Sequence, residues 1–443
     1  MENIQTVSLI NIVDYPQIHF TNACSGEIID RGLSSGSLPV GQYGFAVARE
    51  NFLYIVRDPT GCNKLFFGRG GDGILVVANR AVRVWRQGVP LSAIGSCPPG
   101  HVLQVSHKGV HDLGGSDISG LPSDTQIDFA NFTDQTRSML DQAFRWLASK
   151  FEGCRFVVCL SGGLDSSVVA SFAVKHLPNV TAVSFTYLNK DDLRSHALGA
   201  PVEELASASD DFRCAAKVAS KLGLQLLPTV RSKDAVAGAI RASVQLCQDW
   251  RDFNVHCATV NLFLAQDVRA AFPGEKVVIL TGDLMNEYVC DYVEEQVDGA
   301  VYYKIPRIPL DKRRKYVVRG LDAGDREIGV FWAYGLIACQ PYAVLGGQYM
   351  RLPRSVLERP NIKWVLNGPL LMPQLERHVN RSKTRAQVGG KDLGTLGIYH
   401  RLGVGEEQLR LAWEDQFPTE SSELCREFIQ FGRYKASRYV EQV

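Results

Sequence analysis

The chain has 443 residues, of which 45% are hydrophobic, and this is enough for two or three domains with a large core. Its 48 Lys and Arg nearly balance its 47 Asp and Glu, so the net charge of +1 gives no electrostatic case for a nucleic-acid partner. The sequence lacks an apolar segment of membrane-spanning length and a signal-like start, and its 11 cysteines form no CxxC pair. We therefore expect a soluble, cytoplasmic protein with free thiols, no membrane partner and no metal site built on cysteine.

Residues 5–111 alternate short apolar runs with Gly, Asp and Asn, a pattern typical of strands joined by hairpins. The runs are VSLINIV (7–13), YGFAVA (43–48), FLYIVRD (52–58), KLFFG (64–68) and GILVVA (73–78). They predict a smaller, mainly β domain at residues 1–115. From 111 to 128 the chain is rich in Gly, Ser and Asp, which indicates a linker, and we place it at 116–128.

Beyond the linker, strands are expected to alternate with helices. Phe132, Leu140, Phe144, Leu147 and Phe151 form a helical stripe that leads into an unbroken apolar run at 156–160. Further strands are predicted at 181–185, 224–230 and 276–282, with helices at 212–222, 234–247 and 255–271. This alternation predicts an α/β fold, a doubly wound parallel sheet in a domain at 129–443, with ligands at the C-terminal ends of its strands.

The stretch FVVCLSGGLDSSVVA (156–170) is interpreted as a buried strand, a glycine turn and the start of a helix. Gly162 and Gly163 allow the backbone to approach a ligand, and the first N–H groups of a helix suit an anion. Asp165, in the first helical turn, is well placed to hold Mg²⁺ beside phosphate groups. The string SGGxDSS resembles the signature of ATP pyrophosphatases with a PP-loop. The resemblance implies that the ATP-binding residues are Leu160, Ser161, Gly162, Gly163, Asp165, Ser166 and Ser167.

Several further segments occur in the order found in one family. LYIVRDPTGCNKLFFG (53–68) and PPGHVLQV (98–105) resemble parts of the glutaminase domain of asparagine synthetases, while TGDLMNE (281–287) resembles their SGxGxDE segment. GLIACQPYAVLGGQYMRLP (335–353) and RSK (381–383) resemble two later segments. The chain is therefore similar to asparagine synthetases and β-lactam synthetases. Its N-terminal domain resembles a truncated, degenerate glutaminase domain of the Ntn type.

The departures from that family affect the expected activity. Glu2 stands where the glutaminase nucleophile, an N-terminal cysteine, would be, and Cys24 is interpreted as a small apolar filler. We therefore expect a scaffold domain that cannot hydrolyse glutamine. Asn286 aligns with a family aspartate that helps the PP-loop aspartate bind Mg²⁺. Family charges that shape the acceptor pocket are replaced by Ile337, Cys339 and Val344, which implies a substrate other than aspartate.

The resemblance also assigns roles to other residues. Phe185, Asp211 and Gly282 lie in segments that hold the nucleotide in the family, although Asp211 is equally well explained as a helix N-cap. Lys383 would stabilise the negative charge that develops in the reaction. If a helix begins near residue 283, then Asp283, Glu287 and Asp291 share one face, and they repel one another unless a cation lies among them. A solvated acidic face is the alternative.

Taken together, the resemblance implies an AMP-forming, ATP-dependent carbon–nitrogen ligase. It would adenylate a carboxylate, release pyrophosphate and join the acyl group to an amine. ATP and Mg²⁺ are the implied cofactors, with Asp165 and either Asn286 or Asp283 as metal ligands and Asp283 or Glu287 as the proton acceptor. The carboxylate and the amine are small molecules or parts of one molecule, and a homodimer stays open.

Two further functions stay open beside lactam formation. Loss of glutaminase activity favours an internal or bulky amine, as in β-lactam synthetases, and hence secondary metabolism such as antibiotic biosynthesis. The acidic Asp283 favours amidation with free ammonia instead. A homologue that binds nucleotide and catalyses nothing is the third interpretation.

Overall fold

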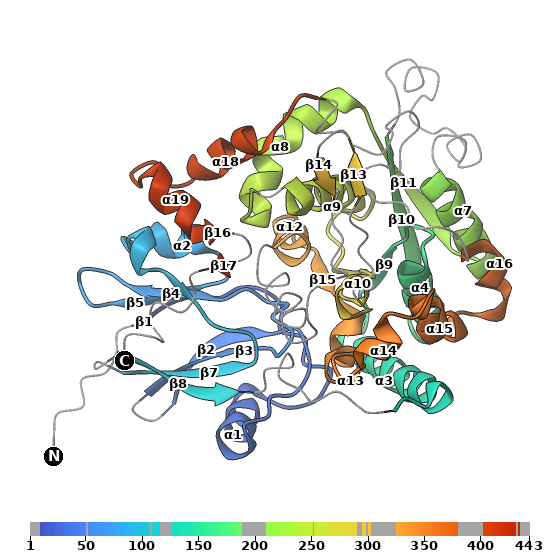
Figure 1. The fold of residues 1–443 in the computed structure, drawn as a ribbon, viewed down its shortest axis with the longest axis horizontal. Helices are drawn as coiled ribbons and strands as arrows, with labels where there is room; N and C mark the ends of the chain where they lie inside the picture. The colour runs from blue at the N-terminus through green and yellow to red at the C-terminus, as the bar shows by residue number, and fades with distance from the viewer. Residues whose placement is uncertain are drawn as a thin grey trace.

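The computed structural model describes residues 9–49, 52–106, 109–115, 126–187, 210–250, 252–289, 295–297, 300–302, 325–379, 402–430 and 433–434. Its N-terminal part contains two four-stranded sheets (Figure 1). One is antiparallel with the strand order β2-β3-β7-β8, and the other has the order β1-β5-β4-β6 with β1 and β5 parallel. The mainly β region expected from the sequence is thus confirmed. The strands are β1 (Leu9–Ile12), β2 (Gly44–Arg49), β3 (Phe52–Arg57), β4 (Phe66–Arg69), β5 (Leu75–Ala78), β6 (Gly95–Ser96), β7 (His101–Ser106) and β8 (Gly109–Gly115).

These two sheets pack face to face, and a helix covers the outer face of each. Ile55 and Leu103 of the first sheet and Phe67 and Val77 of the second are buried in one shared core. The outer face of the first sheet packs on α1 (Ser25–Ser35), whereas α2 (Ala81–Trp85) covers the second. Both faces of β3 are therefore buried from Leu53 onward, which explains the continuous apolar run LYIV.

The C-terminal part is built on a five-stranded sheet with the order β11-β10-β9-β12-β15, in which every pair of neighbours is parallel. The chain runs outward from the central β9 to β10 and β11 and then crosses to β12 and β15 on the other side. Ligands of such doubly wound sheets bind where the strand order reverses, here between β9 and β12. The fold class expected from the sequence is confirmed. The strands are β9 (Arg155–Cys159), β10 (Val180–Tyr187), β11 (Gln225–Arg231), β12 (Val277–Leu280) and β15 (Ile337–Cys339).

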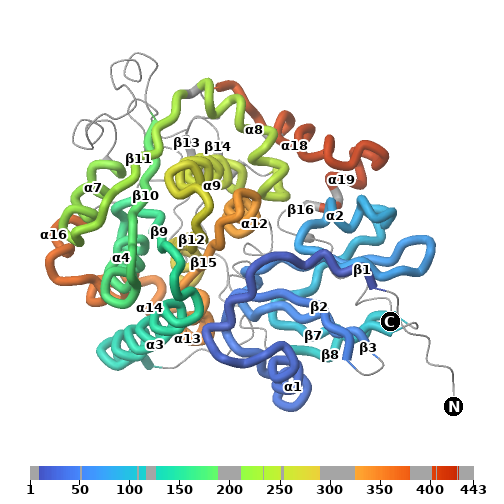
Figure 2. The backbone as a smooth tube through the Cα atoms, turned by 180° about the vertical axis from the view of Figure 1, so that it is seen from behind, coloured from blue at the N-terminus to red at the C-terminus, as the bar shows by residue number. Residues whose placement is uncertain are grey.

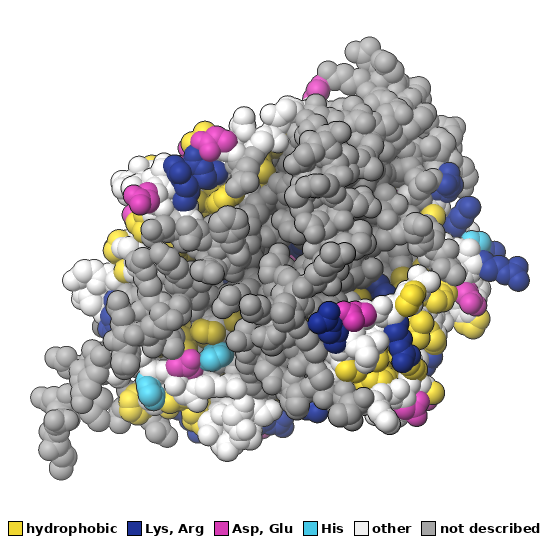
Figure 3. Space-filling model, in the orientation of Figure 1, with side chains coloured by type: hydrophobic (Ala, Val, Ile, Leu, Met, Phe, Trp, Pro, Cys, Tyr) yellow, Lys and Arg dark blue, Asp and Glu magenta, His cyan; other side chains and the backbone are white. Residues whose placement is uncertain are grey.

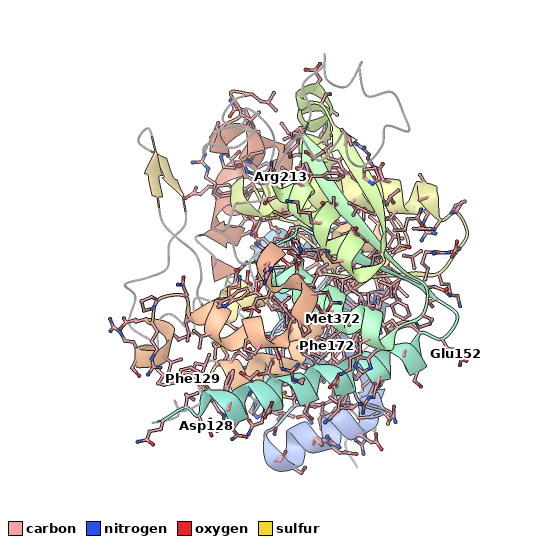
Figure 4. All side chains as sticks on the ribbon, turned by 90° about the vertical axis from the view of Figure 1, so that its right-hand side faces the viewer. Asp128, Phe129, Glu152, Phe172, Arg213 and Met372 are labelled. Carbon is pink, nitrogen blue, oxygen red and sulfur yellow. The ribbon has the colours of Figure 1, made fainter. Side chains whose placement is uncertain are left out.

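Helices cover both faces of the parallel sheet (Figure 2). The helices α3 (Phe129–Lys150), α4 (Leu164–His176) and α7 (Asp210–Leu222) lie on one face, and α9 (Asp252–Ala271) with α12 (Ile328–Trp332) lies on the other. Asp128 caps α3, because its Oδ1 accepts hydrogen bonds from the backbone N–H groups of Ala130 and Asn131 at 3.0 and 3.3 Å. In Figure 4, α3 extends from Asp128 towards Glu152 and passes beneath Phe172 of α4.

The remaining described elements are the longer helix α8, several short helices, two small hairpins and two helices that follow residue 400. They are α8 (Lys233–Cys247), α10 (Met285–Val289), β13 (Glu295–Val297), β14 (Ala300–Tyr302), α13 (Gly346–Tyr349), α14 (Arg354–Leu357), α15 (Ile362–Asn367), α16 (Glu376–Val379), α18 (Glu406–Glu414), α19 (Ser422–Phe428), β16 (Ile429–Gln430) and β17 (Arg433–Tyr434), together with 3-10 turns at Leu91–Ala93, Pro341–Leu345, Gly368–Leu370 and Pro373–Leu375.

The N-terminal part is hydrogen-bonded to the parallel-sheet part at buried positions. Gln42 Nε2 donates to the carbonyl of Ala338 in β15 at 2.6 Å, and its Oε1 accepts from the backbone N–H of Gln340 at 3.0 Å. The Tyr15 hydroxyl donates to Asp325 Oδ2 at 2.6 Å, and both residues are buried. Because a buried polar group without its partner costs about 1–3 kcal/mol, these contacts specify how the two parts meet.

The structure corrects one expectation, adds one strand that was not predicted and leaves the domain boundaries as a prediction. Residues 111–115 belong to strand β8 rather than to a linker, because their backbone pairs with β7. Residues 337–339 form the edge strand β15, which the sequence did not reveal as a strand. The domain boundaries at 115 and 129 stay a prediction, and residues 116–125 lie outside the described residues. On the face drawn in Figure 3, basic and acidic side chains of the described residues are interspersed.

Candidate active site

The glycine turn after β9 is held in shape by its own serines. The Ser161 N–H donates to Ser166 Oγ at 3.2 Å, and this hydroxyl donates to the carbonyl of Gly163 at 3.2 Å. Gly162 has a φ of +71°, and a Cβ on it would lie 2.5 Å from the backbone nitrogen of Ala215 in α7. A glycine is therefore required there on both conformational and steric grounds. The turn leads directly into α4, whose first N–H groups are the predicted phosphate-binding groups, and phosphate binding stays a prediction.

The two strongest sequence motifs meet at this opening. A Cβ on Gly282, just after β12, would lie 2.9 Å from the Ser166 nitrogen and 3.2 Å from the Asp165 carbonyl carbon. The TGDLMNE segment is thus packed against the first turn of α4. Tyr342 completes the contact from the 3-10 turn after β15, donating its hydroxyl to the Asp165 carbonyl at 2.9 Å. Leu160 joins the turn to the sheet, where its N–H donates to Val183 at 2.8 Å.

Two residues assigned to adenosine lie beside the turn. Asp211 is buried in the first turn of α7, the helix whose Ala215 contacts Gly162. Phe185 lies near the C-terminal end of β10, with its ring centroid 6.0 Å from that of Phe263 and 4.5 Å from that of Tyr187. Its partners are thus core aromatic rings. The nucleotide contacts of Phe185 and Asp211 stay predictions.

A lysine that the sequence did not single out lies between the two predicted metal ligands. Lys363 Nζ, from α15, is 2.5 Å from Asp165 Oδ2 and 2.6 Å from Asn286 Oδ1. One carboxylate and one neutral amide, both already in contact with an ammonium group, do not fit a resident Mg²⁺, which prefers octahedral oxygen coordination. Among the described residues, no group of three His, Cys, Asp or Glu side chains could hold a metal ion either.

The acidic residues after β12 surround an arginine instead of a metal. Arg326 Nη2 lies 3.0 Å from Glu287 Oε1 and 3.8 Å from Asp283 Oδ1, and its Nε lies 2.5 Å from Glu327 Oε1. Asp283 precedes α10 rather than sharing a helical face with Glu287, which corrects the expected spacing. The cation beside Asp283 and Glu287 is thus a guanidinium group, and the predicted set of three carboxylates stays untested. Asp291 lies outside the described residues.

Burial and mutual repulsion alter the acidity of this cluster. Burial raises the pKa of Glu327 well above its usual range, opposed by Arg326 and reinforced by Asp283. Burial also raises the pKa of Asp283, which Arg326 again opposes and Glu287 reinforces. The single guanidinium thus does not fully compensate three neighbouring carboxyl groups. A carboxyl group in this cluster can hold or accept a proton near the glycine turn.

Sequence reasoning missed Lys363, Arg326 and Glu327 because none of them belongs to a local motif. The family order of segments pointed to Lys383 as the site cation, and Lys383 lies outside the described residues. Ile362 and Leu366 are buried on one side of α15, and this spacing could have located the helix without showing where Lys363 points.

The N-terminal region is organised by a buried turn. Asp58 accepts hydrogen bonds from the Thr60 hydroxyl at 2.6 Å and from the N–H groups of Cys62 and Asn63 at 3.0 and 3.1 Å. Gly61, with a φ of +70°, completes the turn by donating to the Asp58 carbonyl at 3.0 Å. Cys24 is exposed at the N-terminus of α1, so its interpretation as a small apolar filler is wrong. Glu2 lies outside the described residues.

The chain resembles solved structures at low sequence identity. No curated protein matches the chain significantly. Among solved structures, the NMN synthetase from Francisella tularensis aligns at 14% identity over 72% of this chain and 98% of its own, with a TM-score of 0.24. The NH3-dependent NAD synthetase from Campylobacter jejuni aligns at 12% identity over 72% of this chain and 98% of its own, with a TM-score of 0.26.

No helix in the described parts of the chain has the length and apolar character needed to cross a membrane. The family model for asparagine synthase matches residues 137–298, which include the glycine turn, β12 and the Asn286 segment. This stretch, which is less than half of the chain, is similar to the asparagine synthase family, and the similarity supports an ATP-using, amide-forming ligase.

Proposed function

We propose that this protein is an ATP-dependent carbon–nitrogen ligase that forms an amide or lactam bond and releases AMP. The observation that carries the proposal is the position of Lys363, whose ammonium group faces the first turn of α4 beside the glycine turn, 2.5 Å from Asp165. A backbone anion site and a side-chain cation at the strand-order reversal suit the phosphates of ATP. The buried carboxyl groups around Arg326 suit proton transfer on the neighbouring side.

The proposed reaction has two steps. An oxygen of the substrate carboxylate attacks the α-phosphorus of ATP, the bond to the β-phosphate oxygen breaks, and pyrophosphate leaves. The amine nitrogen then attacks the acyl carbon, the bond to the AMP oxygen breaks, and AMP leaves while the amine proton passes to a carboxylate. Fixing both groups in one site would supply much of the rate by orientation.

Each role has a proposed residue in this chain. Ser161, Gly162, Gly163, Ser166 and Ser167 would hold the pyrophosphate, with Lys363 stabilising negative charge on the phosphates. Asp283, Glu287 or Glu327 would accept the proton of the amine, because hydrogen-bond reach and a suitable pKa are what that role requires. Lys383 stays a second candidate cation. No step is assigned to a resident metal ion.

The amine is proposed to come from the substrate rather than from glutamine. The exposed Cys24 lies within the chain at the start of α1, whereas the glutaminases that this domain resembles use an N-terminal cysteine. An amine in the same molecule as the carboxylate, as in β-lactam synthetases, would make the protein part of secondary metabolism. Amidation with free ammonia is the second candidate, favoured by the acidic Asp283.

ATP–pyrophosphate exchange tests the first step with a panel of carboxylates. Exchange with a diamino or β-amino acid supports lactam formation, and exchange with aspartate supports amidation. Exchange with no carboxylate, by a folded protein, would contradict the ligase and favour a homologue that only binds nucleotide. Asp165→Ala should abolish exchange, whereas the matched control Asp134→Ala, on the exposed side of α3, should not.

A further inference from the structure

We propose that the ammonium group of Lys363 takes the place of a divalent cation between α4 and α10. In this chain Asp165 and Asn286 would bind a protein cation, and divalent ions would reach the site only with the phosphates of ATP. The inference rests on the proposed function for its catalytic meaning, because it concerns the same site. Its first test, metal binding without nucleotide, does not depend on turnover.

One oxygen of each side chain that a metal would need already contacts the ammonium group, whereas Asp165 Oδ1 is buried without a hydrogen-bond partner among the described residues. Lys363 Nζ contacts Asp165 Oδ2 at 2.5 Å and Asn286 Oδ1 at 2.6 Å, so one ammonium joins the two helices. The side chains of Lys363 and Asp165 are only 12% and 13% exposed, so water screens their interaction weakly. A metal ion bound to the same Asp165 oxygen would lie within a few ångströms of the ammonium and would be repelled by it.

The charges of Asp165, Asn286 and Lys363 also disfavour a divalent cation. Asp165 contributes one negative charge, Asn286 contributes none, and Lys363 contributes one positive charge, so the trio is neutral. A divalent cation added to it would leave an excess of two positive charges in a largely buried place, which is strongly unfavourable. A carboxylate at 286 and a neutral side chain at 363 would instead suit a divalent ion.

The lysine is positioned by its helix. Ile362 and Leu366, which precede and follow Lys363 in the sequence of α15, are buried in the main core together with residues of α3 and α4. Asn367, the last residue of the helix, accepts a hydrogen bond from the Tyr349 hydroxyl at 2.6 Å. Lys363 is thus carried by an anchored element rather than by a free surface segment, and its charge is available before nucleotide binds.

Binding of Mn²⁺, followed by electron paramagnetic resonance without nucleotide, tests the proposal. Wild-type protein should show no Mn²⁺ site at Asp165, whereas the double variant Lys363→Met/Asn286→Asp should gain one site that binds Mn²⁺ at least about 100-fold more tightly than any residual binding by the wild type. Adding Asp165→Asn to the double variant should remove that site. The control Lys175→Met removes an exposed lysine of α4, the helix that contains Asp165, and should leave Mn²⁺ binding as in wild type.

One result overturns the proposal even if the double variant fails to fold. Wild-type protein that binds a single Mn²⁺ without nucleotide, and loses it in Asp165→Asn, would show that the ammonium group does not exclude a metal. A second measurement is ATP affinity in the presence of EDTA, which should fall about tenfold or more in Lys363→Met and much less in Lys363→Arg. Equal affinities in all three proteins would also contradict the proposal. Failure of the ligase hypothesis would appear separately, as absent pyrophosphate exchange.

Discussion

The two sides of the candidate site are built by different physical means. On the nucleotide side, Gly162 and Gly282 let three backbone segments approach within contact distance, and the shape of the opening is set by sterics. On the neighbouring side, Arg326 lies among three carboxyl groups, and the arrangement is set by charge. A steric site tolerates almost no larger residue, whereas a charged site responds to pH and to changes in charge. The difference predicts that binding of ATP and acceptance of the second substrate can be disturbed separately.

The largest effect is expected from Arg326→Met, which leaves Glu287 and Glu327 buried without their guanidinium partner. Removing one partner of a buried ion pair destabilises a protein by about 3–5 kcal/mol. The loss, measured by urea unfolding, should be greatest near neutral pH and smaller in acid, where the carboxyl groups are protonated. Arg326→Lys keeps a charge and should lose less. Equal unfolding free energies of Arg326→Met and wild type would refute the charge-based description of this side.

Gly162→Ala tests the steric side. The substitution combines the strain of a non-glycine residue at a φ of +71° with a Cβ 2.5 Å from the Ala215 nitrogen. We expect destabilisation of about 2–4 kcal/mol and a loss of ATP affinity measured by calorimetry. The matched control is Gly153→Ala, where φ is +75° but nothing lies within 4 Å of the new Cβ. It should cost about 1 kcal/mol and leave ATP affinity unchanged. Equal effects of the two substitutions would remove the case for close packing at the turn.

The same difference explains what the sequence could reveal. The glycine turn was predictable because strand, turn and helix follow one another within one short stretch, and local spacing carries the information. The parallel sheet was predictable for a similar reason, since buried apolar runs alternate with helical stripes. By contrast, Lys363 and Asn286 are 77 positions apart in the chain, and only the packing of α15 on α3 and α4 brings them together. The proposed replacement of a metal ion by the Lys363 ammonium group depends on tertiary packing, so no local sequence motif indicates it.

The charge-based side is also expected to depend on pH through Glu327. Because burial raises the pKa of folded Glu327, its contribution to stability is full below the ordinary pKa of a glutamate and is lost as pH rises through the folded value. Glu327→Gln imitates the protonated form, so its melting temperature should rise relative to wild type as pH increases. Glu358→Gln, an exposed glutamate paired with Arg354, serves as the control and should show no such trend. A constant difference between Glu327→Gln and wild type at all pH values would contradict the assignment.

The smallest effect is expected from Cys24→Ala. This variant tests whether the N-terminal region takes part in catalysis. Cys24 is exposed, and the hydrogen bonds at the start of α1 run through backbone atoms: its N–H donates to Glu27 Oε2 at 2.8 Å, and its carbonyl accepts from Ile28 at 3.0 Å. The variant keeps both contacts, so stability should change by less than about 0.5 kcal/mol. Glu27→Ala removes one of them and should cost about 1 kcal/mol. Added glutamine should not increase product formation in any of the three proteins, because glutamine is not hydrolysed. Glutamine-dependent turnover that disappears in Cys24→Ala would instead give the N-terminal region a catalytic role.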